Sequence, residues 1–294
     1  ILDRTQVVCC TCIGSGNEIL DGRRFPQVLI DEATQATEPA SLVALTRGAR
    51  QVVLVGDHKQ LPPTVISFRA EEKGLKRSLF ERLVDLGIEP LLLSTQYRMH
   101  PAISKFPNQH FYSDRLDDGV KSENRLAPAG LLWPDWDNPV AFVPVDGGEI
   151  VSPDGTSREN PTEVSWVIKI LNDILEAGEI TKKDIGIITP YAGQVRAIRN
   201  SMSEKLDDVE VKTVDGYQGR EKEVIIFSCV RSNTQKNIGF LSEMRRLNVA
   251  LTRAKRGLIV IGDPATLRND KNWRAWLEYI RDSKFEAWHL LGMN

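Results

Sequence analysis

Residues 160–189 read NPTEVSWVIKILNDILEAGEITKKDIGIIT, and this stretch decides the fold class. Asn160 can cap a helix, a proline suits the first turn, and Glu163 completes a capping-box-like start. The apolar residues that follow have helical spacing and form one stripe: Val164, Val167, Ile168, Leu171, Ile174 and Leu175. Gly178 ends this helix, and the short apolar run 185–189 then predicts a buried strand.

The same alternation extends in both directions along the chain. Short apolar runs predict strands at 7–12, 28–31, 52–56, 91–94, 140–145, 185–189, 224–229 and 258–262. A second amphipathic helix is expected at about 192–206. Most of the runs are apolar on both faces, which is typical of buried parallel strands with helices between them. The sequence therefore predicts an α/β protein with mostly parallel sheets.

Composition excludes several classes of protein. The chain has 294 residues, of which 41% are hydrophobic and 27% charged, so it is neither disordered nor collagen-like. No apolar run approaches the roughly 18 residues that span a bilayer, and the first residues lack the pattern of a secretion signal. The net charge is −2, so a nucleic-acid site would have to be a local basic groove.

Four cysteines lie in apolar runs. We interpret Cys9, Cys10, Cys12 and Cys229 as buried structural thiols rather than metal ligands. Unbridged cysteines suit a reducing compartment, so an intracellular location is expected, with the cytoplasm favoured and the nucleus left open.

The length suggests about two domains. The first four strand candidates fall within residues 1–95, and residues 96–294 have their own alternation of strands and helices. The segments 112–139 and 146–160 are rich in Pro, Gly, Asp and Asn, which predicts loops on the second domain.

Polar side chains follow two of the predicted strands. The run 28–30 leads directly into Asp31 and Glu32, and the run 52–56 leads into Asp57 and Gln60. Ligand sites in parallel sheets lie at the carboxyl ends of strands, and adjacent carboxylates there suit a Mg²⁺–nucleotide site. A solvated turn or a helix cap explains each pair equally well when it is taken alone.

Five motifs, taken together in their order along the chain, favour the nucleotide site over a solvated turn or a helix cap. They are DEATQATEP at 31–39, GDHKQLPP at 56–63, QYRMHP at 96–101, VDGYQGREKEVIIFSCVRSN at 214–233 and RRLNVALTRAKRGLIVIGDP at 245–264. The order, the spacing and the residues of these motifs strongly resemble those of superfamily 1 helicases of the up-frameshift type. The resemblance covers essentially the whole chain. The resemblance implies two RecA-like domains with ATP and Mg²⁺ in the cleft between them.

For the first domain, the resemblance implies that Asp31 coordinates Mg²⁺ and that Glu32 is the catalytic base. Gln60 would sense the γ-phosphate and couple hydrolysis to domain closure.

For the second domain, the resemblance implies that Tyr97 stacks on adenine and that Arg98 and Arg253 are arginine fingers. Gly219 and Glu221 would contact the γ-phosphate and the ribose. A guanidinium suits this task because it meets phosphate oxygens bidentately. A surface ion pair for Arg98 and a structural salt bridge for Glu221 stay open.

Nucleic-acid contacts are expected across the top of both domains. The candidates are Thr11, Pro62, Pro63, Thr189, Gln194, Thr213, Val214 and Asp215. Hydroxyls, amides and backbone N–H groups suit phosphates, which dominate binding that is independent of sequence. A purely structural role is open for each of them.

One expected motif is absent. The phosphate-cradling pattern GxxxxGK[ST] does not occur in the chain. In the family this loop lies upstream, so we expect a carboxyl-terminal part of a helicase core whose first domain is truncated at its N-terminus. Weak ATP binding and little turnover are expected of this piece alone. The helicase of nonsense-mediated mRNA decay, around which this family is grouped, has Ser at the position of Ala33, so the branch of the family is left open.

Two classes of function remain to be compared. The first is an ATP-driven motor that moves 5′ to 3′ on single-stranded RNA or DNA, with RNA favoured by the resemblance. The second is a catalytically idle RecA-like scaffold that binds nucleic acid or a protein partner. The intact protein is expected to be a monomer without a membrane partner, and protein regulators are left open.

Overall fold

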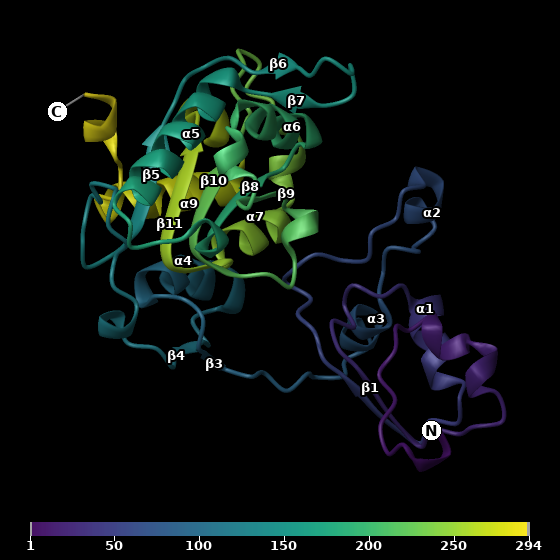
Figure 1. The fold of residues 1–294 in the computed structure, drawn as a ribbon. Coiled ribbons are helices and arrows are strands. Elements are labelled where there is room, and N and C mark those ends of the chain that lie inside the picture. Colours follow the sequence, from purple (N-terminus) through teal and green to yellow (C-terminus); the bar gives the residue numbers. More distant parts are fainter. Residues whose placement is uncertain (1, 293–294) are drawn as a thin grey trace. The chain divides into compact units, whose positions relative to one another are not determined.

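The computed structural model describes residues 2–292. The chain divides into two compact units, Ile1–Leu92 and Leu93–Asn294 (Figure 1). None of the helices in the described part combines the length and apolar character that crossing a bilayer requires.

The second unit is built on a five-stranded sheet in which every neighbouring pair of strands is parallel. Across the sheet the strands are β5 (Val140–Pro144), β11 (Ala254–Gly262), β10 (Lys222–Ser228), β8 (Ile185–Thr189) and β9 (Glu210–Thr213). The predicted α/β class with a parallel sheet is therefore confirmed. Strand β9 was not predicted, because its sequence EVKT alternates polar and apolar residues, as suits an edge strand.

Helices cover both faces of this sheet. α5 (Pro161–Glu176) and α6 (Ala192–Ser201) share a buried apolar cluster with one face, where Ile170 and Ile198 join Ile226. On the other face α9 (Lys271–Asp282) stacks Trp273 on Phe227, with ring centroids 6.1 Å apart. Alternate residues of a strand face opposite sides, so Ile226 and Phe227 serve the two layers.

The start of α5 differs from the predicted capping box. Asn160 Oδ1 accepts from Glu163 N at 3.2 Å, as expected of the N-cap. In a capping box the Glu163 side chain would accept from Asn160 N. Here Asn160 N donates to Gln194 Oε1 instead, at 2.8 Å. α6 ends at Ser201 rather than near residue 206, since Met202 is extended.

The second unit has further helices, strands and turns. They are β3 (Thr95–Gln96), α4 (Pro101–Tyr112), β4 (Asp117–Asp118), β6 (Ile150–Val151), β7 (Arg158–Glu159), α7 (Met244–Leu251) and α8 (Pro264–Leu267), with the 3₁₀ turns η7 (Asp215–Tyr217) and η8 (Gly239–Ser242). β3 and β4 pair in parallel, and β6 and β7 pair antiparallel.

The first unit has a two-stranded parallel sheet, formed by β1 (Gln27–Ile30) and β2 (Gln51–Leu54). Its helices are α1 (Glu38–Leu45), α2 (Phe68–Glu72) and α3 (Leu79–Asp85).

Two strand predictions in this region are wrong. Residues 7–12 and 91–94 form no strand, and within residues 2–292 no strand pairs with either segment. Val7 is 71% and Leu91 97% exposed, so neither segment is covered as a buried strand would be. Ser94, at the end of the second segment, accepts from Asp117 N at 2.8 Å, where the pairing of β3 with β4 begins. Cys9 and Cys10 are exposed as well and Cys12 is only partly buried, which corrects their interpretation as buried thiols, whereas Cys229 is buried as predicted.

Candidate functional site

The acidic pair of the first unit lies on an exposed turn directly after β1. Glu32 N donates to Asp31 Oδ1 at 3.0 Å, and Gln35 Nε2 donates to Glu32 Oε2 at 2.7 Å. Glu32 has a φ of 50°, a left-handed conformation that is uncommon outside glycine. The turn therefore presents two neighbouring carboxylates at the carboxyl end of a strand.

Gln60 lies in the corresponding turn after β2. Its Nε2 donates to Asp57 Oδ2 at 2.9 Å. The two turns approach closely at Gly56, where an added Cβ would lie 3.1 Å from Thr34 N. Because β1 and β2 are parallel, their carboxyl ends meet at the same edge of the sheet. The structure thus brings the turn of the acidic pair and the turn of Gln60 together.

The donor set of the acidic turn fits Mg²⁺. The described residues contain no group of three or more His, Cys, Asp or Glu side chains arranged to hold a metal. Mg²⁺, however, is usually bound by one or two carboxylates together with substrate phosphates and water. Asp31 would hold the ion in that way, and Glu32 would remain beside it.

In the second unit, Arg98 is the centre of a polar cluster. Its Nε donates to Glu221 Oε2 at 2.6 Å, and its Nη1 donates to the Thr252 carbonyl at 3.1 Å. Lys255 Nζ lies 3.1 Å from Glu221 Oε1. Partial burial raises the pKa of Glu221, but the bonds from Arg98 and Lys255 outweigh this effect and hold it below the usual value. Three distant motifs therefore meet at one guanidinium.

Arg253 lies next to this cluster, at the end of α7. Its side chain is 2% exposed, with Nε donating to Val249 O at 3.1 Å and Nη2 donating to Thr252 Oγ1 at 2.9 Å. Its own carbonyl accepts from Lys222 N at 3.1 Å, which joins the start of β10 to the residue directly before β11. The Arg253 side chain is thus buried and hydrogen-bonded within the unit, whereas the Arg98 side chain is only half-buried.

Tyr97 and Gly219 border the same cluster in sequence. The Tyr97 side chain is 69% exposed, so its ring is accessible for stacking. Gly219 has a φ of 73°, which a residue with a side chain rarely adopts, and this bend shapes the turn before Glu221.

The ion pair that was the alternative interpretation of Arg98 and Glu221 is formed. It does not exclude a nucleotide role, because exposed pairs are weak and open to competition.

The candidate nucleic-acid residues of the second unit gather where β8 and β9 end. Thr189 pairs with Thr213 in the ladder, and Val214 N donates to the Thr189 carbonyl at 3.1 Å. Thr189 and Val214 are almost fully buried, and Asp215 is exposed and pairs with Arg246 at 3.3 Å. Thr213 and Asp215 are therefore the members of this set that solvent reaches.

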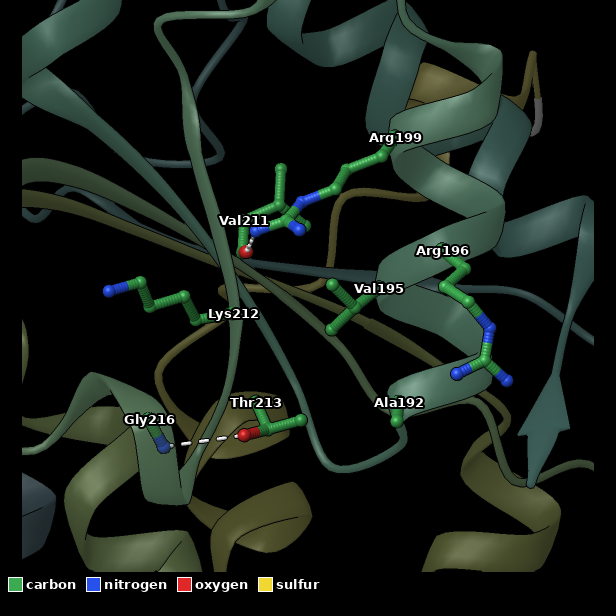
Figure 2. Close-up of a pocket in the computed structure, with 8 residues that line it drawn as sticks. All are labelled: Ala192, Val195, Arg196, Arg199, Val211, Lys212, Thr213 and Gly216. Carbon is green, nitrogen blue, oxygen red and sulfur yellow. Dashed lines mark hydrogen bonds between the residues drawn. The ribbon is translucent and has the colours of Figure 1, made fainter. Parts of the chain in front are cut away.

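A hollow of about 280 Å³ lies beside Thr213 (Figure 2). It is lined by Ala192, Val195, Arg196, Arg199, Val211, Lys212, Thr213 and Gly216. Its cations already have partners: Arg199 donates to Val211 O at 2.7 Å, Arg196 pairs with Asp154, and Lys212 pairs with Glu210. The hollow is thus a mainly apolar recess between α6 and β9, and its three cations are held by partners within the unit.

Gln194 does not reach the surface. Its side chain is fully buried, and its Nε2 donates to Ser228 Oγ at 2.8 Å while its Oε1 accepts from Asn160 N. The amide predicted to contact nucleic acid is therefore occupied inside the unit, and it connects α6 to β10 and to the start of α5.

Sequence reasoning missed the acid at the centre of this network. Glu163 Oε2 accepts from Ser228 Oγ at 2.6 Å and from Val230 N at 2.8 Å. Burial raises the pKa of Glu163 to about 8, although both hydrogen bonds act in the opposite direction. Val230 has a φ of 72°, a strained value for a β-branched residue. The only signal in the sequence was an acid in the first turn of a helix.

The remaining candidates lie in the first unit. Thr11 is exposed, and its Oγ1 accepts from Gly14 N at 2.9 Å. Pro62 is half-buried and Pro63 is buried, in the segment that follows Gln60. No contact in the described part assigns a role to these three residues.

Comparison with known proteins places these motifs in a family. A family model described as an AAA domain matches residues 75–265, and a second model with this description matches residues 1–68. A "Regulator of nonsense transcripts 1 homolog" from Neurospora crassa is 47% identical over 97% of this chain and 27% of its own length. The Drosophila melanogaster protein of the same name is 45% identical, with coverage of 97% and 25%.

A third relative, "ATP-dependent helicase NAM7" from Saccharomyces cerevisiae, is 46% identical over 96% of this chain and 30% of its own length. The chain thus spans between a quarter and a third of these relatives. The matches agree with the five motifs and with the parallel α/β fold. The chain belongs to the AAA domain family and, within it, to the superfamily 1 helicases of the up-frameshift type.

Proposed function

We propose that this chain is part of an ATP-dependent nucleic-acid helicase, in which ATP hydrolysis drives 5′-to-3′ movement along a single strand. The observation that carries the proposal is the convergence of three motifs on Arg98, which bonds to both Glu221 and the Thr252 carbonyl.

The side chains divide the chemistry between them. Bound Mg²⁺–ATP would supply the triphosphate and the ion that neutralises part of its charge. Glu32 would accept a proton from water, and Asp31 would hold the ion. Arg98 would exchange its bond with Glu221 for phosphate oxygens, because an exposed ion pair is weak and phosphate carries more charge.

The strand is proposed to bind at the ends of β8 and β9. Thr213 and Asp215 are accessible there, and buried Thr189 and Gln194 would fix the shape of the loops rather than touch the strand. The name of the Neurospora relative refers to transcripts, which supports RNA over DNA.

Steady-state ATP hydrolysis by the full-length protein tests this proposal. We expect hydrolysis that increases on addition of single-stranded RNA, and loss of turnover in Glu32→Gln with strand binding retained. Glu176→Gln, an exposed glutamate on α5, is the matched control. Strand binding without any ATP hydrolysis by the unaltered protein would instead favour the scaffold. A parallel assay with single-stranded DNA shows whether RNA or DNA increases hydrolysis more.

A further inference from the structure

Phe240 is a large apolar side chain that the second unit leaves 58% exposed. It lies in η8, and its backbone is firmly attached: Phe240 N donates to Tyr191 Oη at 3.2 Å. The two rings are tilted by 36°, with centroids 5.4 Å apart. Phe240 is therefore exposed although its backbone and its ring are both held by Tyr191.

The support beneath Phe240 is buried. Tyr191 is 5% exposed, and its hydroxyl also accepts from Arg231 Nη1 at 3.0 Å. Arg231 is itself 5% exposed and pairs with Glu149 at 2.7 Å. Gly239, with a φ of 56°, allows the turn to approach, because an added Cβ would lie 1.9 Å from Arg231 Nη1. The fold thus presents Phe240 on a rigid base.

The surroundings of the ring match those of a strand-binding surface. The Arg246 guanidinium carbon lies 5.4 Å from the ring centroid, and Arg246 pairs with Asp215 at 3.3 Å. Tyr191 follows Thr189 at the end of β8, and Asp215 follows Thr213 at the end of β9. Phe240 is therefore linked through Tyr191 to the loop after β8, and through Arg246 and Asp215 to the loop after β9.

We propose that Phe240 is a stacking platform for one base of a bound single strand, with the Arg246 guanidinium beside its ring. Every base has a π face, so an exposed aromatic ring next to a backbone-binding edge binds single strands without sequence preference. A guanidinium near the ring strengthens such a site through cation–π and phosphate contacts. This inference rests on the proposed function, and it adds a base contact to a site otherwise described by backbone-binding groups.

Equilibrium binding of the 294-residue chain to a labelled oligouridine strand tests the platform. We expect Phe240→Ala and Phe240→Leu to lower the affinity by about tenfold, as removal of one stacked aromatic does. Phe240→Tyr, which keeps the π face, should bind like the unaltered chain. Trp136→Ala is the matched control, since Trp136 is 52% exposed in the loop that leads into the amino end of β5.

An abasic strand of equal length separates stacking from charge. All variants should bind it equally, because it carries the phosphates without the bases. Ultraviolet crosslinking of a 5-iodouridine strand to the unaltered chain should yield a peptide that contains Phe240, and this measurement does not depend on the folding of a variant.

Unchanged affinity in Phe240→Ala and Phe240→Leu, or an equal loss on the abasic strand, would overturn the platform while the proposed function stands. If the unaltered chain binds neither strand, the proposed nucleic-acid site and the platform fail together.

Discussion

Arg98 Nε donates to Glu221 Oε2 at 2.6 Å, although 123 positions separate the two residues in the chain. Glu221 shares its other oxygen with Lys255 at 3.1 Å. One carboxylate therefore balances two cations from two different motifs, and its charge decides how firmly the Arg98 guanidinium is held.

Glu221→Gln is expected to lower the free energy of unfolding by about 0.5–1 kcal/mol at pH 7, because the pair is partly exposed. The pKa of Glu221 is lower in the folded chain than its ordinary value. The charged form thus stabilises the fold above the ordinary pKa, and this contribution is lost as the pH falls through the lowered value. Urea unfolding at a series of pH values should show wild type and variant converging towards acid pH. Asp282→Asn, in the exposed pair with Arg281, is the control. A difference in stability that does not change with pH would contradict the lowered pKa of Glu221.

Arg98→Lys is expected to reduce the kcat of ATP hydrolysis in the full-length protein by roughly a thousandfold, the lower range for loss of an arginine finger. Lysine keeps the charge but cannot meet two phosphate oxygens in one plane, so KM for ATP should change little. Steady-state kinetics separates the two parameters. Arg281→Lys, on an exposed stretch of α9, should leave both unchanged. A large rise in KM with normal kcat would assign Arg98 to nucleotide binding alone.

Most of the second unit could be predicted from the sequence for a physical reason. The strands β5, β8, β10 and β11 are apolar on both faces, and only a parallel sheet covered by helices on two sides buries such runs. The edge strand β9 lacked that signal.

The site could be predicted only as a set of residues. The motifs identify Arg98 and Glu221, but nothing in their spacing says that they bond to each other. The burial of Gln194 depends on Asn160 and Ser228, which lie 34 positions away on either side. Such tertiary partners are fixed by the packing of α5 and α6 on the sheet, which local sequence does not contain. The failed strands at 7–12 and 91–94 show the same limit, because a strand requires a neighbour.

Glu163 is expected to make stability depend on pH in the opposite direction to Glu221. Its pKa is about 8 in the folded chain, against an ordinary 4.5. Between these values the folded state holds a proton that the unfolded state has lost, so the free energy of unfolding falls as the pH rises through this window. Glu163→Gln should remove this slope, and Glu163→Ala should cost about 1–3 kcal/mol by leaving Ser228 and Val230 N without their acceptor.

Urea unfolding from pH 5 to pH 9 measures the slope, with Glu176→Gln as the exposed control on the same helix. A Glu163→Gln variant with the wild-type slope would show that Glu163 stays ionised throughout the range.

Gly239→Ala is expected to destabilise the second unit by more than its backbone angle alone requires. The left-handed φ of 56° costs an alanine about 1–2 kcal/mol. The added Cβ would also lie 1.9 Å from Arg231 Nη1 and 2.5 Å from Tyr191 Oη, both parts of the buried cluster under Phe240. Displacing them should cost a further 1–3 kcal/mol or so, typical of an overpacked core.

Gly178→Ala is the matched control for this steric effect. Gly178 has a φ of 74° and nothing within 4 Å of an added Cβ, so it reports the backbone cost alone. Thermal unfolding of the two variants isolates the clash, and strand binding below the transition should weaken only in Gly239→Ala, because Phe240 follows directly. Equal losses of stability in both variants would show that the Arg231–Tyr191 cluster yields without cost and does not hold Phe240 rigidly.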